Sequence, residues 1–454
     1  MPSGQYGVIL AYIILPGAIM TFIATAPTRW LGEKTILVSG HSLHPQTPSP
    51  VSEGFVAPIL ASQISFRPDA LAASMARTLT LRAAPDVLLA QWARSQLTQV
   101  EFLVTDGASF ELSPFITALA DAERSGFAGR VGAGITDLLM NALGYVWRDN
   151  AICLSSSLDP HADFVYAGGS VEGHGVVLAE AHGSFAQSVN ESRITGEAKR
   201  KYLRQVKPHI ANHCVHGDVV HGYSVAFGSN PSSLETYLHV AETKISKSKG
   251  QPRPPTPQPS PRGPGPVPTS VAFTSHRSNF LLMGAAQIVA WIDWLRGAGE
   301  RPADDSMTTF FKIELAGRSF LVAAEHFFPY FRGRFLLDEL EFRGGPLHWE
   351  EFERWRRGIR SGTANVFAMD EWAAKSFLLG LSEMIRGGRE QVPPALDLPS
   401  VEPFGLSFGL DREHRDEDAR YPVIQFRDGL ALLRKLPRSP IASVRHWSPQ
   451  QGFI

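Results

Sequence analysis

The chain has 454 residues, of which 44% are hydrophobic and 19% are charged, and its formal net charge is −1. The hydrophobic content excludes a disordered chain, and the length is typical of two or three domains. The nearly neutral balance means that any contact with nucleic acid must come from a local basic patch. The two cysteines, Cys153 and Cys214, exclude a Cys-rich zinc module and are typical of a reducing compartment, so we expect no disulfide.

Residues 1–27 are apolar, and residues 6–27 carry no charge. This run is long enough to span a membrane, which takes about 20 apolar residues. Arg29 and Lys34 follow it, so a spanning helix would leave the bulk of the chain in the cytoplasm. The alternative is a pair of buried strands that turn at Pro16-Gly17, because the run is rich in Ile, Val, Tyr and Phe. We therefore expect a cytoplasmic protein, with a membrane-anchored form as the alternative.

The N-terminal lead-in as a whole, residues 1–124, is expected to be mixed α/β. Residues 72–96 are rich in Ala and Leu and predict one or two helices. Residues 100–104 predict a short strand, and residues 114–124 predict a helix. Nothing in this lead-in indicates a chemical function.

Residues 125–245 predict an α/β core with a defined order of elements. Apolar residues at helical spacing predict a helix over 131–143, and a second helix is predicted over 197–210. Short apolar runs predict strands at 150–156, 163–167, 176–181, 219–227 and 234–240. The resulting order is α-β-β-β-α-β-β, which predicts a central mixed sheet flanked by helices.

Two strands of this core carry acidic residues at their ends. Asp163 opens the run DFVYA, and Glu180-Ala181-His182 ends the run VVLAEA and is followed by Gly-Ser-Phe. With the order of elements over residues 126–243, these motifs resemble the PD-(D/E)XK (restriction-endonuclease-like) superfamily. In that family an Asp begins the second core strand and a Glu-X-Lys lies on the third, so His182 stands where the family has lysine.

The resemblance implies a fold of the restriction-endonuclease-like type and a metal-dependent phosphodiesterase site. Asp163 and Glu180 would hold Mg²⁺, which favours oxygen ligands, and His182 would complete the catalytic set as a general base or proton donor. Many relatives carry a Glu on the first helix, whereas Gly132-Ala133-Gly134 stands there and Asp137 is the nearest carboxylate. Two functions therefore stay open: a divergent nuclease acting on DNA or RNA, and a catalytically inactive binding protein on the same fold.

The second helix of the core is strongly basic. Its cationic residues are expected to contact the phosphates of nucleic acid without reading its sequence; they are Lys199, Arg200, Lys201, Arg204 and Lys207. The alternative is an ordinary solvated helix face.

A histidine-rich segment follows that helix. His209 and His213 are four residues apart, as two zinc ligands on one helical turn would be, and Cys214, His216 and Asp218 follow. The segment lacks the glutamate of the zinc-protease motif, and Pro208 disturbs the helix. Histidines at a helix end and in a loop are the favoured interpretation.

Residues 246–270 are rich in proline and predict an extended linker that forms neither ladders nor helices. The C-terminal region, residues 271–454, is expected to be a separate α+β or helical domain. It predicts a helix over 279–296, a hairpin from 310–314 and 319–323 around Ala316-Gly317, and helices over 349–360 and 369–386; a charged run follows at 411–420. The sequence gives this region no chemistry and does not indicate an oligomeric state.

Overall fold

The computed structural model describes residues 33–453, apart from short gaps between 48 and 106 and gaps at 152–159, 169–174, 246–263, 316, 325–364, 409–422 and 435–440. The apolar run 6–27, the helix predicted over 349–360 and the charged run 411–420 lie outside the described residues. No helix within the described part of the chain is long and apolar enough to span a membrane.

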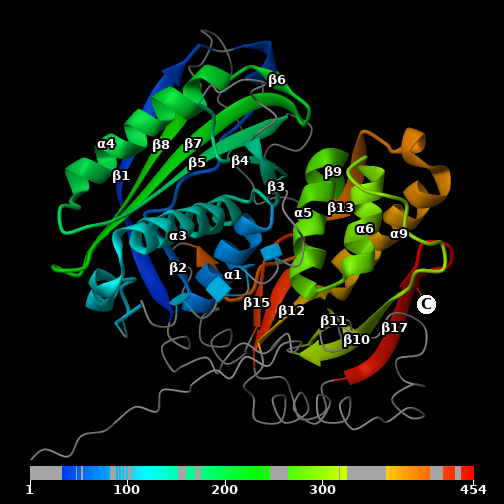
Figure 1. Cartoon of the computed structure of the whole chain (residues 1–454). Helices are drawn as coiled ribbons and strands as arrows, with labels where there is room; N and C mark the ends of the chain where they lie inside the picture. The colour runs from blue at the N-terminus through cyan, green and yellow to red at the C-terminus, as the bar shows by residue number, and fades with distance from the viewer. Residues whose placement is uncertain are drawn as a thin grey trace, which may run out of the picture.

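The first sheet is mixed and curled, and it carries most of the N-terminal half (Figure 1). Its strand order is β14-β2-β1-β8-β7-β5-β4-β3, and the short β6 pairs with β7. The β5–β7 and β1–β8 pairs are parallel, and the others are antiparallel. The strands are β1 Lys34–Gln46, β2 Gln63–Phe66, β3 Trp147–Asn150, β4 Phe164–Ala167, β5 Val176–Phe185, β6 His213–Cys214, β7 Gly217–Asn230, β8 Glu235–Ile245 and β14 Leu406–Phe408.

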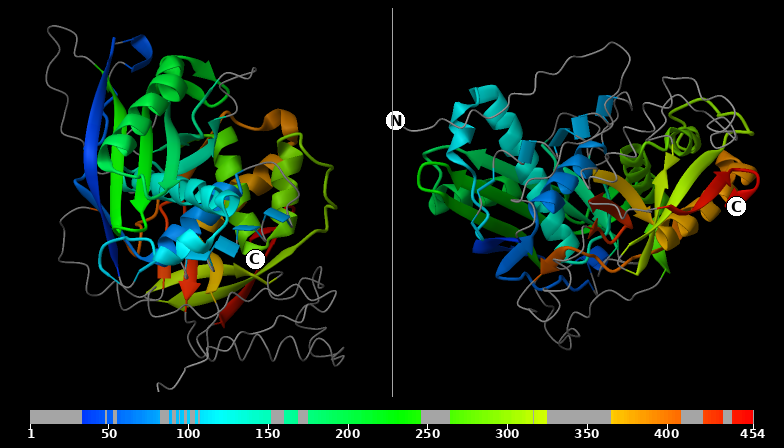
Figure 2. Two further views of the ribbon diagram at one scale, coloured as in Figure 1. Left: turned by 60° about the vertical axis from the view of Figure 1, so that its left-hand side comes forward. Right: turned by 90° about the horizontal axis from the view of Figure 1, so that it is seen from below.

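Helices cover both faces of this sheet (Figures 1 and 2). On one face lie α1 (Pro68–Leu79) and α3 (Asp121–Ala142). On the other lies α4 (Glu191–Lys201), which continues through a π-helical turn, Tyr202–Val206, and a 3-10 turn, Lys207–His209. The predicted order α-β-β-β-α-β-β is confirmed, with β6 as a small addition before β7.

Glycines let the two main helices approach the sheet closely. A Cβ on Gly183 of β5 would lie 1.8 Å from the carbonyl oxygen of Ala128 in α3, and one on Gly132 would lie 2.6 Å from the backbone of His182 and Gly183. The prediction that α3 begins near residue 131 is therefore wrong. The helix starts ten residues earlier, at Asp121, and Gly132 and Gly134 are contact points inside it.

Two strand predictions in the first half need correction. The strand predicted at 150–156 is β3, which ends at Asn150, while residues 152–159 lie outside the described part. Most of the strand predicted at 100–104 lies outside the described part, at residues 101–103; of its ends, Val100 is helical and Val104 forms an isolated bridge with Leu112. Short apolar runs do not distinguish a strand from a buried helical turn.

The second sheet is antiparallel and belongs to the C-terminal part. Its order is β15-β16-β12-β11-β10-β17-β18. The predicted hairpin is confirmed as β10–β11, and the helix predicted over 369–386 is α9, Glu371–Gly387. The strands are β10 Thr308–Leu315, β11 Arg318–Ala323, β12 Asn365–Asp370, β15 Val423–Gln425, β16 Leu430–Arg434, β17 Ile441–Ser448 and β18 Gly452–Phe453.

The helix predicted over 279–296 is two helices. These are α5, Thr269–Met283, and α6, Ala286–Leu295. Gly284 separates them with φ of 82°, a left-handed conformation that favours glycine and ends a helix. α5 begins ten residues before the predicted start, and its first turns are as buried as its last.

The end of the proline-rich segment forms a strand, contrary to the expectation that the whole run is an unpaired spacer. β9 (Pro264–Pro268) pairs antiparallel with β13 (Ala395–Pro399). Prolines alternate with Gly265 and Val267 in this strand, so the residues that keep an N–H all point to the same side. A strict alternation of proline thus leaves one edge of the strand able to pair.

The two halves of the chain are in contact. β14 comes from the C-terminal part and pairs with β2 at the edge of the first sheet. α5 lies beside β3, where the backbone N–H of Arg148 donates to the Ser275 hydroxyl at 2.8 Å (Figure 1). One apolar core includes residues of both halves.

Candidate functional site

The two predicted acidic residues lie side by side. β4 and β5 are antiparallel neighbours, with Phe164 opposite Ala179. This register sets Asp163, which immediately precedes β4, beside Glu180 of β5, and the backbone N–H of Ala181 donates to Asp163 Oδ2 at 3.0 Å. The strand pairing brings together two carboxylates that are far apart in the sequence.

Glu180 is fully buried and only partly satisfied. Its Oε1 accepts a 2.7 Å hydrogen bond from Lys201 Nζ, whereas its Oε2 has no hydrogen-bond partner among the described residues. Burial, first, and then the negative charge of Asp163 raise the pKa of Glu180 to about 8, although Lys201 opposes the shift. A buried carboxyl group with a free oxygen is costly in a folded protein unless the site is built to use it.

Lys201 joins the site from α4. The helix follows β5 and crosses the face that carries Glu180, so the last residue of α4 lies above the strand. Ile194, Ala198 and Tyr202 are buried against the sheet, whereas Lys201 beside them is half-buried and reaches Glu180. The sequence interpretation placed Lys201 among phosphate contacts. The sequence feature that could have indicated this contact is the position of Lys201 next to the buried face of the helix that follows β5 and packs over it.

His182 lies two residues after Glu180 and therefore on the same face of β5. Its side chain is half-buried, and burial lowers its pKa more than any other cause. The carboxylate of Glu197 acts in the opposite direction, while the cations of Lys201, Arg200 and Arg193 lower the pKa further. The imidazole is therefore neutral near pH 7 and has the charge state of a base.

The geometry fits a hard cation with two protein ligands. Within the described residues, no group of three or more His, Cys, Asp or Glu side chains gathers at a point. Asp163 and Glu180 supply carboxylate oxygens, and Glu180 Oε2 is the buried oxygen without a partner. Magnesium commonly uses one or two carboxylates and takes its other oxygens from water and substrate phosphates, so this donor set matches its chemistry.

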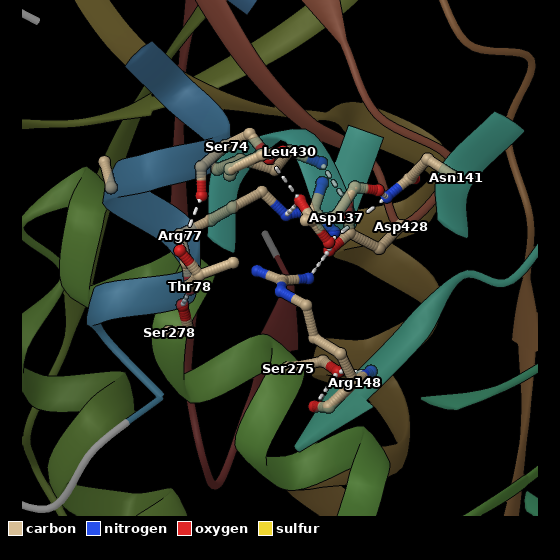
Figure 3. Close-up of polar contacts among 12 residues, drawn as sticks. Ser74, Arg77, Thr78, Asp137, Asn141, Arg148, Ser275, Ser278, Asp428 and Leu430 are labelled. Carbon is tan, nitrogen blue, oxygen red and sulfur yellow. Dashed lines mark hydrogen bonds and ion pairs between the residues drawn. The ribbon is translucent and has the colours of Figure 1, made fainter. Parts of the chain in front are cut away.

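Asp137, the nearest carboxylate on the first helix, does not contribute to the site. It is fully buried in a polar network on the other face of the sheet (Figure 3). Asp137 Oδ2 lies 3.2 Å from Arg77 Nε and accepts a 2.7 Å bond from Ser74, and Oδ1 accepts a 3.0 Å bond from Tyr166. The absence of a first-helix acid in the sequence motif thus agrees with the geometry, because Asp137 already has a structural role.

The same buried network connects the two halves of the chain. Asp428, between β15 and β16, lies 2.8 Å from Arg148 of β3 and 3.2 Å from Arg77 of α1, and all three side chains are fully buried. Asn279 of α5 donates to the same carboxylate at 3.0 Å. The two arginines hold the pKa of Asp428 at about 2 despite its burial. Four elements therefore meet at one ionised carboxylate (Figure 3).

The predicted basic stripe divides into different environments. Lys199, Arg200, Arg204 and Lys207 are exposed, and Arg200 pairs with Glu197 one turn earlier. Burial, first, and then the nearby cations of Lys207 and Lys199 lower the pKa of His44 in β1. The exposed cations therefore extend from the Glu180 site toward His44 of β1.

The histidines of residues 209–218 contact separate partners in the described structure. His209 Nε2 lies 3.0 Å from the carbonyl oxygen of Pro160, and His213 Nδ1 lies 2.8 Å from Asp218 Oδ1. His216 instead points toward α5, where its Nδ1 lies 2.7 Å from the Ser270 hydroxyl. The favoured interpretation, histidines at a helix end and in a loop, agrees with these contacts.

Comparisons with known proteins find no match: no family model, no curated protein and no solved structure is similar to the chain. Any assignment of function therefore depends on the geometry of the site itself.

Proposed function

We propose that the chain is a divergent, metal-dependent nuclease-like hydrolase that acts on phosphodiester bonds of nucleic acid. The observation that supports this most directly is the meeting of Asp163, Glu180 and Lys201 at one place on β5, with His182 beside them. Two carboxylates next to a lysine provide an ion site and a compact positive charge, which are the groups that phosphodiester hydrolysis needs.

Each residue has a defined role in this proposal. Asp163 and Glu180 would hold Mg²⁺, which when bound would polarise the phosphate and lower the pKa of the attacking water. The ammonium group of Lys201 offsets the negative charge that develops on the phosphoryl oxygens. Neutral His182 accepts a proton from water near the end of β5. Lys201 would thus do the work of the catalytic lysine of the restriction-endonuclease-like superfamily, whose position in the motif is occupied here by His182.

The exposed cations beside the site support nucleic acid as the substrate class. Lys199, Arg200, Arg204 and Lys207 can neutralise backbone phosphates without sequence readout. If the chain binds DNA or RNA in a salt-dependent way but does not cut it, the binding protein on the same fold becomes the better description.

The proposal is tested by incubating the purified full-length chain with labelled DNA and RNA in Mg²⁺ or Mn²⁺. Replacing Glu180 by Gln keeps its shape and removes its ability to ionise and hold a metal ion, and it should lower the cleavage rate at least about 100-fold. Glu235→Gln, on an exposed part of β8, is the matched control and should cut as the wild type does. Equal cutting by wild type and Glu180→Gln would sink the hydrolase assignment.

A further inference from the structure

A second cluster of reactive side chains lies where β3, the turn between β6 and β7, and α5 meet. His216 in the turn places Nδ1 2.7 Å from the hydroxyl of Ser270. Its other ring nitrogen, Nε2, lies 3.5 Å from Oδ2 of Asp149 in β3. A hydroxyl, an imidazole and a carboxylate are therefore neighbours, although they come from three distant parts of the sequence.

We propose that Ser270, His216 and Asp149 form a serine-hydrolase site that cleaves carboxylic esters. Ser270 is the nucleophile, His216 is its general base, and Asp149 is a positioning residue that holds the imidazole. The ring is turned relative to the familiar arrangement, with serine at Nδ1 and aspartate at Nε2. The chemistry is unchanged, because either nitrogen of a neutral imidazole can accept while the other donates.

The carboxylate of Asp149 is held firmly. Its Oδ2 accepts a 2.7 Å hydrogen bond from Thr274 of α5, and its Oδ1 accepts a 2.6 Å bond from the backbone N–H of Asn150. The tautomer with the proton on Nε2, which faces Asp149 at 3.5 Å, leaves Nδ1 bare toward Ser270. This is the tautomer that a general base requires.

Charge and burial set the protonation states of the cluster at neutral pH. Burial raises the pKa of Asp149 to about 6 and lowers that of His216 to about 4, and the nearby cation of Arg296 lowers both. Near pH 7.5 the carboxyl group is ionised and the imidazole is neutral. Ser270 keeps partial exposure while His216 is buried, so the hydroxyl is the most accessible member of the cluster.

Ser270 lies in the first turn of the 15-residue helix α5. The first N–H groups of a helix have no intrahelical acceptor, and the helix dipole favours negative charge there. The backbone N–H of Thr269 already donates to the carbonyl oxygen of Pro394 at 3.0 Å, and the helix dipole supplies partial positive charge next to the nucleophile, where an oxyanion would form during acyl transfer.

The reaction balances in two steps. In the first, the Ser270 Oγ–acyl bond forms, the ester C–O bond breaks, and the serine proton passes through His216 to the leaving alcohol. In the second, water gives a proton to His216, attacks the acyl carbon and breaks the bond to Oγ, and His216 returns the proton to Ser270.

The chain contains its own control for this geometry. Ser42 of β1 lies 2.7 Å from Nε2 of His239, the same separation as in the Ser270–His216 pair. The other nitrogen of His239 lies 3.0 Å from the hydroxyl of Thr195, so no carboxylate orients this ring. A reagent selective for activated serine should therefore distinguish the two pairs.

The test uses the full-length chain, a fluorophosphonate probe and p-nitrophenyl acetate. The probe forms an Oγ–P bond with loss of fluoride, and mass spectrometry should locate it on Ser270. Labelling should be lost in Ser270→Ala and His216→Gln and kept in Ser42→Ala. Ester hydrolysis should fall at least about 100-fold in Ser270→Ala. Absence of label on wild-type Ser270, or label unchanged in Ser270→Ala, would overturn the proposal even if His216→Gln fails to fold.

Asp149→Asn tests the positioning role. It should lower kcat of ester hydrolysis at least about tenfold, because the ring loses its fixed tautomer, while KM and the melting temperature stay at the wild-type values. An unchanged kcat would remove Asp149 from the site. Glu180→Gln should leave labelling of Ser270 intact, so this proposal and the nuclease proposal fail or stand separately.

Discussion

At the scale of single residues, Gly183 lets β5, the strand that carries Glu180, lie directly against α3. It has no room for a side chain, because a Cβ would meet the carbonyl oxygen of Ala128 at 1.8 Å. Backbone atoms cannot yield as a flexible side chain can, so an added methyl group must separate α3 from β5. Gly183 is also the next residue after His182, so this separation would shift the site.

We expect Gly183→Ala to destabilise the protein by about 2 kcal/mol or more in urea unfolding, as overpacking of a core does. Gly196→Ala is the matched control, because it lies in α4 with nothing within 4 Å of the added Cβ. Alanine there should stabilise the chain by roughly 0.5–1 kcal/mol through helix propensity. A Gly183→Ala variant as stable as Gly196→Ala would contradict the described contact between α3 and β5.

His276 is a second residue with a measurable consequence. It is fully buried in α5, stacks on Phe377 at a centroid distance of 3.8 Å, and has no hydrogen-bond partner for either ring nitrogen among the described residues. Burial lowers its pKa from 6.5 to about 3. The unfolded chain therefore takes up a proton below pH 6.5 that the folded chain excludes, and stability is lost as the pH falls from 6.5 toward 3.

His276→Phe should remove this loss. Near pH 7.5 the variant should match the wild type within about 1.5 kcal/mol, because a ring replaces a ring. Compared with the wild type, the free energy of unfolding of the variant should be ~2 kcal/mol higher at pH 5 than at pH 7.5. This figure comes from the one and a half pH units between 6.5 and 5, at 1.36 kcal/mol each. Urea unfolding of both proteins at the two pH values measures the difference. A gap that is the same at pH 7.5 and pH 5 would show that His276 is not excluded from protonation.

At the scale of elements, the order of helices and strands in the core could be predicted, and with it the adjacency of Asp163 and Glu180. Two consecutive strands that form a hairpin-like pair bring their residues together whatever the rest of the fold does. The predicted closeness of His182 follows from the same strand. These predictions depend only on local patterns and on neighbouring strands.

Other elements could not be predicted, because their signals are tertiary. The glycines of α3 lower helix propensity, and the close contacts of Gly132 with β5 and of Gly134 with α1 arise only in the folded chain. β9 needed a partner more than 100 residues later, since Pro268 lies opposite Ala395. The role of Lys201 and the line of Asp149, His216 and Ser270 likewise arise from contacts between distant segments.

At the scale of the whole molecule, Asp428 joins the N-terminal and C-terminal halves. Replacing it by Asn leaves Arg77 and Arg148 facing each other without their shared carboxylate, and both are fully buried. We expect Asp428→Asn to lower the free energy of unfolding by about 3 kcal/mol or more, as loss of one partner of a buried ion pair does.

Asp304→Asn provides the control for Asp428→Asn. Asp304 pairs with Arg301 at 2.8 Å, but its side chain is 57% exposed, so its removal should change stability by less than about 1 kcal/mol. Chemical unfolding followed by tryptophan fluorescence reports on both variants. Equal effects at the two positions would mean that the halves do not depend on the buried network.

The central claim is that Asp163, Glu180 and Lys201 act together as a hydrolytic site, and the cleavage rate of labelled DNA by Lys201→Met tests it most directly. Methionine keeps the length of the side chain and removes the charge next to Glu180. The rate should fall at least about 100-fold, whereas Lys244→Met, at an exposed position of β8, should cut at the wild-type rate. Wild-type cleavage by Lys201→Met would contradict the account.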